Sequence, residues 1–343
     1  MHTHIRIGDH VRWLITGGAG FIGTNLATHA INRGDEAVIL DDLSRSGSEL
    51  NASFLESSFG LSTNRIDVSS RDELSAFFAK QEGFDAIAHL AGQVSFLASL
   101  EDPRRDFEIN ALGTLNILEH VRQNSPETTV IGMSSNKVYG DLTQVHFIED
   151  ATRYIAPDYP AGFAEDMPLA FHGPYGCSKG TADQYLTDYG RIFGLKTASL
   201  RQSSVYGPHQ HPRSDQGWVA HLLEEAVSGK TIQLNGVGKQ VRDLLHATDL
   251  ARLFVALVES IKPGTDNAVN VGGGVSNSLS ILELFAWIER RTGRAVDFRT
   301  GDPRPSDQQV FISDNSRVTE LTGWSPSVDV EQGLDGLLAS LEG

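Results

Sequence analysis

The chain has 343 residues, 40% of them hydrophobic and 21% charged, a composition typical of a globular protein long enough to bury a sizeable core. Its formal net charge of -16 argues against nucleic acid or an anionic membrane as a partner, because both repel an acidic surface. The single cysteine, Cys177, excludes a disulfide framework and indicates a reducing compartment, for which we expect the cytoplasm. We expect neither a membrane span nor a signal peptide, because no apolar run approaches the roughly 20 residues that cross a bilayer.

The beginning of the chain has the pattern of a phosphate-binding turn. An apolar run at 11–16 predicts a strand, and a helical pattern begins at Phe21. Between and just after them lie Gly17, Gly20 and Gly23, which permit a tight turn, close approach of a pyrophosphate, and close packing of the helix on the strand. The free N–H groups of a helix N-terminus favour an anion. The pattern therefore predicts a dinucleotide site.

The next apolar run, residues 37–40, ends in Asp41 and Asp42. Asp41 lies 18 residues beyond Gly23, where a carboxylate accepts hydrogen bonds from ribose hydroxyls. Because a carboxylate repels a 2′-phosphate at this position, the sequence favours NAD over NADP. The alternative is that Asp41 merely ends a strand.

Strand and helix patterns then alternate along the chain. We expect a third strand that ends at 66–68, further strands at 86–90 and 129–133, and helices at 73–80 and 107–122. Such alternation is typical of the α/β class, with a parallel, right-handed, doubly wound Rossmann sheet. Ligands bind at the carboxyl ends of such strands, so Asp41 and Ser135 are expected to face one crevice.

Tyr175 and Lys179 are four residues apart and fall on one face of a predicted helix. An ammonium near a phenol favours the phenolate, as does a bound cationic ring. A free tyrosine titrates near ~10, and lowering its pKa by ~3 units requires ~4 kcal/mol. Taken alone, the pair is better explained as a chance surface pair, because such spacings occur everywhere.

The rest of the chain contains a long connection, an apolar helix and a second region. Segment 141–173 has no clear period, and its aromatic content favours an ordered lid. The apolar stripe that continues to Ile192 indicates a packing or subunit face. The runs at 232–234 and 241–245 flank a glycine-rich turn and predict a hairpin. Further helices are expected at 218–227, 249–259 and 279–291, further strands at 197–200, 268–271 and 296–299, and two short helices at the end. We expect an NAD-binding domain at 11–205, rejoined by 246–272, and a smaller α/β nucleotide-sugar-binding domain at 206–245 and 273–343.

Together these features resemble the extended short-chain dehydrogenase/reductase family, the NAD-dependent epimerases and dehydratases of nucleotide sugars. The resemblance rests on five motifs in order: Gly17-x-x-Gly20-x-x-Gly23, the strand-end Asp41, Ser135, Val138-Tyr139-Gly140, and Tyr175-x-x-x-Lys179. It implies that Tyr175 is the general base. It also implies that Lys179 lowers the pKa of this phenol and holds the nicotinamide ribose, and that Ser135 polarises the reacting oxygen.

The same resemblance implies the binding residues, and it implies no metal. The NAD-binding residues would be Gly17, Gly20, Phe21, Ile22, Gly23, Asp41, Asp42, Ser44, Arg45, Asp67, Val68, Leu90, Ala91, Gly92, Gln93, Asn110, Ser134, Tyr175, Lys179, Gln202 and Ser203. The substrate-binding residues would be Gln93, Asn136, Lys137, His172, Ser204, Val219, Arg242 and Arg304. His172 is also compatible with a structural role and Lys137 with a solvated loop lysine.

The residues after Ser135 favour one reaction of the family. Dehydratases resembling this chain carry an Asp-Glu pair where Asn136 and Lys137 stand, so we expect epimerisation rather than elimination of water. The surrounding segments and Ser204 resemble the members that invert carbon-2 of a CDP-linked 6-deoxy or dideoxyhexose, although Ser135 stands where those have threonine. The alternatives are a UDP- or GDP-sugar 4-epimerase, an NADPH-dependent ketosugar reductase and a non-catalytic NAD-sensing scaffold. The striped helices at 107–122 and 180–193 predict a homodimer or homotetramer.

Overall fold

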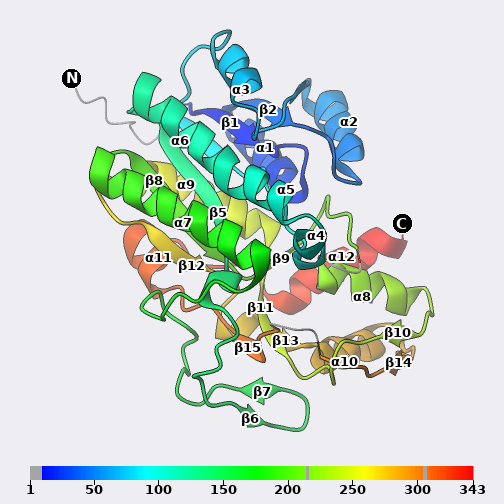
Figure 1. The fold of residues 1–343 in the computed structure, drawn as a ribbon. Coiled ribbons are helices and arrows are strands. Elements are labelled where there is room, and N and C mark those ends of the chain that lie inside the picture. Colours follow the sequence, from blue (N-terminus) through cyan, green and yellow to red (C-terminus); the bar gives the residue numbers. More distant parts are fainter. Residues whose placement is uncertain (1–9, 214–215, 304–306, 343) are drawn as a thin grey trace.

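The computed structural model describes residues 10–213, 216–303 and 307–342, and its centre is a seven-stranded sheet in the order β12-β8-β5-β4-β1-β2-β3 (Figure 1). Every neighbouring pair in this sheet is parallel. Its strands are β1 (Arg12–Thr16), β2 (Glu36–Asp41), β3 (Thr63–Arg65), β4 (Ala86–His89), β5 (Thr129–Ser135), β8 (Lys196–Gln202) and β12 (Ala268–Val271). The doubly wound α/β class predicted from the sequence is confirmed. The order of strands reverses between β1 and β4, where such sheets bind ligands.

Helices cover both faces of this sheet because its strands are apolar on both sides. Alternate residues of β1 belong to different cores: Trp13 and Ile15 pack on one face and Leu14 on the other. The first face carries α1 (Phe21–Arg33), α2 (Ser48–Phe59), α9 (Ala247–Ser260) and α11 (Ser316–Thr322). The second carries α3 (Arg71–Phe78), α6 (Gly113–Asn124) and α7 (Gly173–Phe193), of which α6 and α7 cross the front of Figure 1. Among helices of the described residues, none is long and apolar enough to cross a membrane.

The helix expected at 107–122 is interrupted. After α4 (Phe96–Glu101), α5 (Pro103–Phe107) leads into a π-helical turn, Glu108–Leu112, before α6 begins. Turns of this kind are rare and occur frequently at functional sites. This one carries Asn110, whose side chain is buried beside α7.

A second, smaller region lies at the carboxyl ends of the central strands. Its strands are β9 (Ser204–Tyr206), β10 (Ile232–Gln233), β11 (Val241–His246), β13 (Ser278–Ser280), β14 (Phe298–Arg299) and β15 (Val310–Phe311). Its helices are α8 (Trp218–Val227), a 3-10 turn at Val275–Asn277, α10 (Ile281–Thr292) and α12 (Val330–Glu342). Helices α8, α10 and α12 share one apolar core with β10 and β11. The domain division at 205, 245 and 273 stays our proposal.

The prediction of a hairpin around the glycine-rich turn is wrong. β10 pairs with β14, whereas β11 pairs with β9, β13 and β15. A turn signal predicts that the two runs beside it pair with each other, but here each run pairs with strands that are distant along the chain. The turn at 235–238 therefore connects two different sheets.

The long connection at 141–173 is ordered, but its aromatic residues form a core rather than a lid. Following the 3-10 turn Asn136–Tyr139, it contains the short hairpin of β6 (Ile148–Glu149) and β7 (Tyr154–Ile155), at the bottom of Figure 1. Phe163 is buried between Tyr159 and Phe311. Arg153 at the hairpin forms a 2.6 Å ion pair with Glu283 on α10. These contacts fasten the segment to the smaller region.

Candidate active site

Two adjoining cavities form one cleft along the carboxyl ends of the central strands. The first, of about 190 Å³, lies over the turn between β1 and α1 and reaches Tyr175 and Lys179. The second, of about 690 Å³, lies between the central sheet and the smaller region. Both cavities are lined by Phe21, Ile22 and Gln202. A ligand can therefore extend from one into the other.

The glycines of the turn explain how the first cavity can hold a phosphate. Gly17 has a φ of +66°, and a Cβ there would lie 2.6 Å from the backbone nitrogen of Ala91. A Cβ on Gly23 would lie 2.4 Å from the carbonyl oxygen of Gly17, so this glycine lets α1 pack on the turn. Gly20 lines the cavity and has no side chain to fill it. No side chain caps the N-terminus of α1, and its first turn is not acidic, as a pyrophosphate requires.

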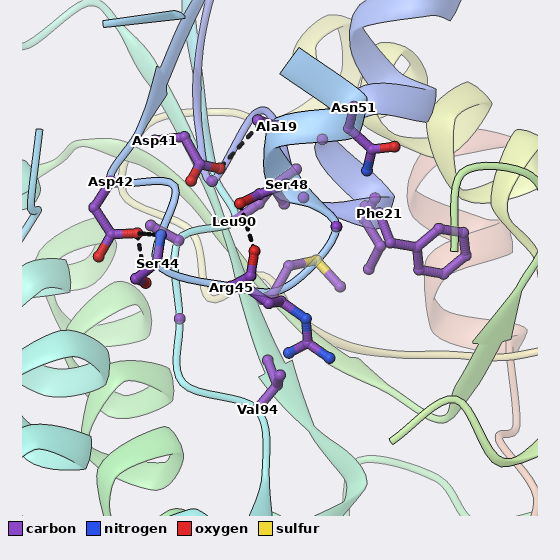
Figure 2. Close-up of a pocket in the computed structure, with 18 of the residues that line it drawn as sticks. Ala19, Phe21, Asp41, Asp42, Ser44, Arg45, Ser48, Asn51, Leu90 and Val94 are labelled. Atoms are coloured by element: carbon purple, nitrogen blue, oxygen red, sulfur yellow. Dashed lines mark hydrogen bonds between the residues drawn. The ribbon is translucent and has the colours of Figure 1, made fainter. Parts of the chain in front are cut away.

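The end of β2 presents two carboxylates to the same cavity (Figure 2). Asp41 accepts hydrogen bonds from the backbone N–H groups of Ala19, at 3.1 Å, and Leu43, at 2.8 Å. These bonds fasten β2 to the glycine turn, and burial raises the pKa of Asp41. Asp42 accepts from the hydroxyl of Ser44 at 2.7 Å.

The guanidinium of Arg45 lies in the cavity, between Phe21 and Val94 in the view of Figure 2. A second arginine, Arg105, is paired with Asp67 on the cavity wall, at 2.6 Å. The first cavity is thus lined by acidic groups at the end of β2 and by the cation of Arg45. This arrangement suits ribose hydroxyls beside a pyrophosphate.

Most of the predicted NAD-binding residues line this first cavity. They are Gly17, Gly20, Phe21, Ile22, Gly23, Asp41, Asp42, Ser44, Arg45, Asp67, Val68, Leu90, Ala91, Gly92, Tyr175, Lys179 and Gln202. Ser203 instead lines the second cavity, and Ser134 is buried at the end of β5.

Gln93 and Asn110 lie behind the cavity wall, and protein groups satisfy their amide donors. The Asn110 amide donates to the carbonyl oxygen of Gln93 and to the hydroxyl of Ser178, both at 3.0 Å. The Gln93 amide donates to the carbonyl oxygen of Ser95 and to Asp106. These two residues hold the strand-end segment at Gly92 against α7.

The predicted catalytic residues meet where α7 passes the end of β5. Tyr175 and Lys179 lie one turn apart in α7 and are buried, and the hydroxyl of Ser135 is hydrogen-bonded to the Tyr175 phenol. Ser135 ends β5 and also accepts from the backbone N–H of Lys137 at 3.2 Å. The Lys179 ammonium donates to the carbonyl oxygen of Met133 at 3.2 Å.

Burial dominates the electrostatics of this pair. It raises the pKa of Tyr175 to about 12, which the Ser135 hydrogen bond opposes. It lowers the pKa of Lys179 to about 8, which the charge of Asp106 opposes. The expected depression of the Tyr175 pKa by Lys179 is thus not produced by the protein's own groups, because desolvation of the phenolate outweighs them.

The predicted substrate-binding residues are divided between the cavity and its surroundings. Ser204, Val219 and Arg242 line the second cavity. Arg242 is largely buried, forms a 2.8 Å ion pair with Asp307, and also donates to the carbonyl oxygen of Gln308. This fixed guanidinium can meet a phosphate or another anion.

Three other predicted substrate contacts, Asn136, Lys137 and His172, line neither cavity. The Asn136 amide donates to Gln308 Oε1 at 2.8 Å, and His172 lies 3.1 Å from Asp141. Lys137 belongs to the 3-10 turn that follows Ser135. Arg304 lies outside the described residues.

Sequence reasoning missed several polar residues of the site. In the second cavity these are His221, Glu225, Thr231, Gln233, Asn235 and Gln240. They come from α8, from β10 and from the connections before and after β10, and no motif marks them. Asp106 was also missed, although its position four residues before Asn110 places both on one helical face.

The buried Ser-Tyr-Lys group beside a glycine turn defines an enzyme that uses a nicotinamide dinucleotide. Residues 13–272 match the model of the NAD dependent epimerase/dehydratase family, and the chain belongs to that family. It is 43% identical to a CDP-paratose 2-epimerase of Salmonella typhi, over 94% of this chain and 97% of the relative. It is 32% identical to a UDP-glucose 4-epimerase of Mycolicibacterium smegmatis, over 94% and 96%.

A solved structure has the same fold. The UDP-glucose 4-epimerase of Thermus thermophilus, in complex with NAD, superimposes with a TM-score of 0.81 at 28% identity, covering 97% of this chain and 99% of that one. The cofactor of the present chain is NAD, in agreement with the family and with the acidic end of β2.

Proposed function

We propose that this chain is an epimerase that inverts carbon-2 of a CDP-linked 6-deoxy or dideoxyhexose, converting CDP-paratose to CDP-tyvelose. The observation that carries the proposal is the continuous cleft. One half contains the buried Tyr175 and Lys179, and the other is a 690 Å³ cavity lined by Arg242, a size that suits a nucleotide. The 43% identity to a CDP-paratose 2-epimerase over nearly the whole chain supports the choice of sugar.

The chemistry follows from the substrate. Carbon-2 of a nucleotide sugar has no adjacent carbonyl, so its hydrogen is not acidic enough for direct removal. The residues given above as lining the first cavity would hold NAD, which when bound supplies a hydride acceptor and donor and a positive charge. Tyr175 takes the proton of the C2 hydroxyl as the C2 hydride leaves, which gives a 2-keto sugar. Return of hydride to the opposite face, and of the proton from Tyr175, completes the inversion.

The other residues of the group serve this transfer. Ser135 donates a hydrogen bond to the reacting oxygen, and Lys179 holds the ribose of the cofactor. Elimination of water requires a carboxyl acid next to Ser135, where Asn136 and Lys137 stand, and the Asn136 amide is already bonded to Gln308. The site is therefore suited to epimerisation rather than dehydration.

The substrate is tested by incubating the protein with CDP-paratose, UDP-glucose and GDP-mannose in deuterated water and following each by proton NMR. We expect only CDP-paratose to turn over, with inversion at carbon-2 and no uptake of solvent deuterium, since the hydride returns from the cofactor. NAD released on denaturation should approach one equivalent. Turnover of UDP-glucose with inversion at carbon-4 would instead identify the 4-epimerase alternative.

Glu225 favours cytosine in the second cavity. Glu225 on α8 lines this cavity, and its carboxylate pairs with Lys230 at 2.7 Å. A carboxylate accepts from the 4-amino group of cytosine but repels the O4 of uracil. We expect Glu225→Gln to reduce kcat/KM for CDP-paratose about tenfold relative to the UDP form of the same sugar. The control is Glu224→Gln, whose carboxylate is exposed next to it and lines neither cavity. An unchanged ratio in Glu225→Gln would reject this assignment.

We infer that the chain acts as a homodimer or homotetramer in the cytoplasm. Apolar side chains are exposed at Phe107 on α5 and at Tyr185, Ile192 and Phe193 on α7. Burying such a patch against a second copy removes it from water. We expect Ile192→Glu to shift the protein to monomers in sedimentation equilibrium. Leu50→Glu is the matched control, because both side chains are 65% exposed and Leu50 lies on α2. A parent protein that is monomeric would exclude the assembly.

A further inference from the structure

A buried carboxylate lies behind the catalytic turn without a role in the chemistry described so far. Asp106 belongs to α5 and is 1% exposed. Its Oδ1 accepts from the amides of Gln93, at 3.0 Å, and Asn110, at 3.2 Å. A buried carboxylate is costly unless hydrogen bonds and a counter-charge compensate it. Oδ2 has no hydrogen-bond partner among the described residues, and burial raises the pKa of Asp106, so the question is which cation favours the charged form of this carboxyl.

Asp106 is linked to the first turn of α7 by a chain of hydrogen bonds. The Asn110 amide that donates to Asp106 also donates to the hydroxyl of Ser178, at 3.0 Å. The Ser178 hydroxyl in turn donates to the carbonyl oxygen of Tyr175, at 3.2 Å. The π-helical turn brings Asn110 to this position. Asp106 is thus connected through hydrogen bonds to the turn of α7 that carries Tyr175 and leads to Lys179.

The charges around the catalytic pair identify the cation. Lys179 is buried, and Asp106 raises its pKa against the effect of burial. Among the described residues, the other titratable group that faces this ammonium from a neighbouring strand is His89 on β4. Its ring contacts Thr16 and Thr114, and burial lowers its pKa to about 3, so it is neutral. Tyr175 faces Asp106 as well, and there the carboxylate raises the pKa of the phenol.

We propose that Asp106 is a positioning residue of the catalytic pair: its charge keeps Lys179 in the ammonium form that binds ribose, and its hydrogen bonds through Asn110 and Ser178 fix the turn that carries Tyr175. The kinetic part of this inference rests on the proposed epimerase. The charge relation between Asp106 and Lys179 does not depend on the substrate.

The direction in which the two pKa values change distinguishes this role of Asp106 from a purely structural one. Removing the negative charge of Asp106 lowers the pKa of Lys179 from about 8, because the ammonium loses a neighbour that stabilises it. It also lowers the pKa of Tyr175 from about 12, because the phenolate loses a neighbour that repels it. Lys179 must be protonated and Tyr175 deprotonated to act. The alkaline limb of the pH profile, which Lys179 sets, and the acid limb, which Tyr175 sets, therefore both move to lower pH. A packing defect would lower activity without displacing the limbs.

The test is Asp106→Asn, which keeps an oxygen that can accept from Gln93 and Asn110 but removes the charge. The Lys179 Nζ is titrated by 15N NMR, in protein without sugar, and assigned with Lys179→Gln. We expect its pKa to fall by on the order of one unit, a typical shift for a neighbouring charge, and the alkaline limb of kcat/KM for CDP-paratose to follow. Glu108→Gln is the control, since it removes a half-buried carboxylate of the same stretch, one that lies 4.0 Å from the guanidinium of Arg105. An unchanged Lys179 titration in Asp106→Asn would overturn the proposal.

Two further measurements cover the cases in which Asp106→Asn does not fold or no CDP-sugar reacts. If Asp106→Asn does not fold, the Lys179 Nζ signal of the parent protein should still show a second step in acid as Asp106 takes up its proton. Absence of that step overturns the proposal. If the titration shifts as expected but no CDP-sugar turns over, the charge relation holds and the proposed function fails instead.

Discussion

Replacement of Tyr175 by phenylalanine is expected to reduce kcat by about a thousandfold or more, because a positioned general base contributes about 10²–10⁴ to the rate. The phenol is buried and its hydroxyl is bonded to Ser135. Phenylalanine keeps the aromatic ring and lacks only the hydroxyl oxygen, so little packing is lost. The loss of one hydrogen bond should cost only about 1 kcal/mol of stability.

The measurement is proton NMR of CDP-paratose turnover, with circular dichroism and the amount of retained NAD as checks on folding. Tyr185→Phe is the control. Tyr185 lies on the same helix, is 39% exposed and lines neither cavity. We expect the control to keep parental activity. Near-normal turnover by Tyr175→Phe would refute the assigned mechanism and would leave the Ser-Tyr-Lys group a structural one.

The parts of the site that could be predicted are those encoded by short, local patterns. The glycine turn, Asp41 at the end of β2 and the spacing of Tyr175 and Lys179 each occupy a few neighbouring residues. Strand ends meet at one edge of a parallel sheet, so local patterns that follow strands converge in space. For this reason the first cavity contains most of the residues expected in it.

The parts that could not be predicted depend on partners distant in sequence. The pairing of β10 with β14 joins segments more than sixty residues apart, and the local turn signal at 235–238 pointed elsewhere. The roles of Gln93 and Asn110 depend on whether their amides face the cavity or Asp106, which spacing does not specify. The pKa of Tyr175 depends on burial, which the Tyr-Lys spacing does not specify either.

Loss of the Arg201 guanidinium is expected to destabilise the protein by about 3–5 kcal/mol, the usual cost of breaking a buried ion pair from one side. Arg201 on β8 holds Asp183 on α7 with two hydrogen bonds, Nε to Oδ1 at 3.1 Å and Nη2 to Oδ2 at 2.8 Å. The side chains are 6% and 0% exposed. In Arg201→Met, Asp183 would keep a bond from the Ser199 hydroxyl but lose its counter-charge.

This ion pair also concerns catalysis, because Asp183 follows Lys179 by one helical turn and Tyr175 by two. The free energy of unfolding of Arg201→Met is measured in urea beside Arg191→Met, which breaks an exposed pair with Asp188 and should cost less than about 1 kcal/mol. Adding Asp183→Leu to Arg201→Met should recover most of the loss, since an uncompensated buried charge is its main source. Two outcomes would show that the contact between α7 and β8 depends on packing and not on this ion pair. One is a loss of less than about 1 kcal/mol of stability in Arg201→Met, and the other is a double variant that is less stable than Arg201→Met.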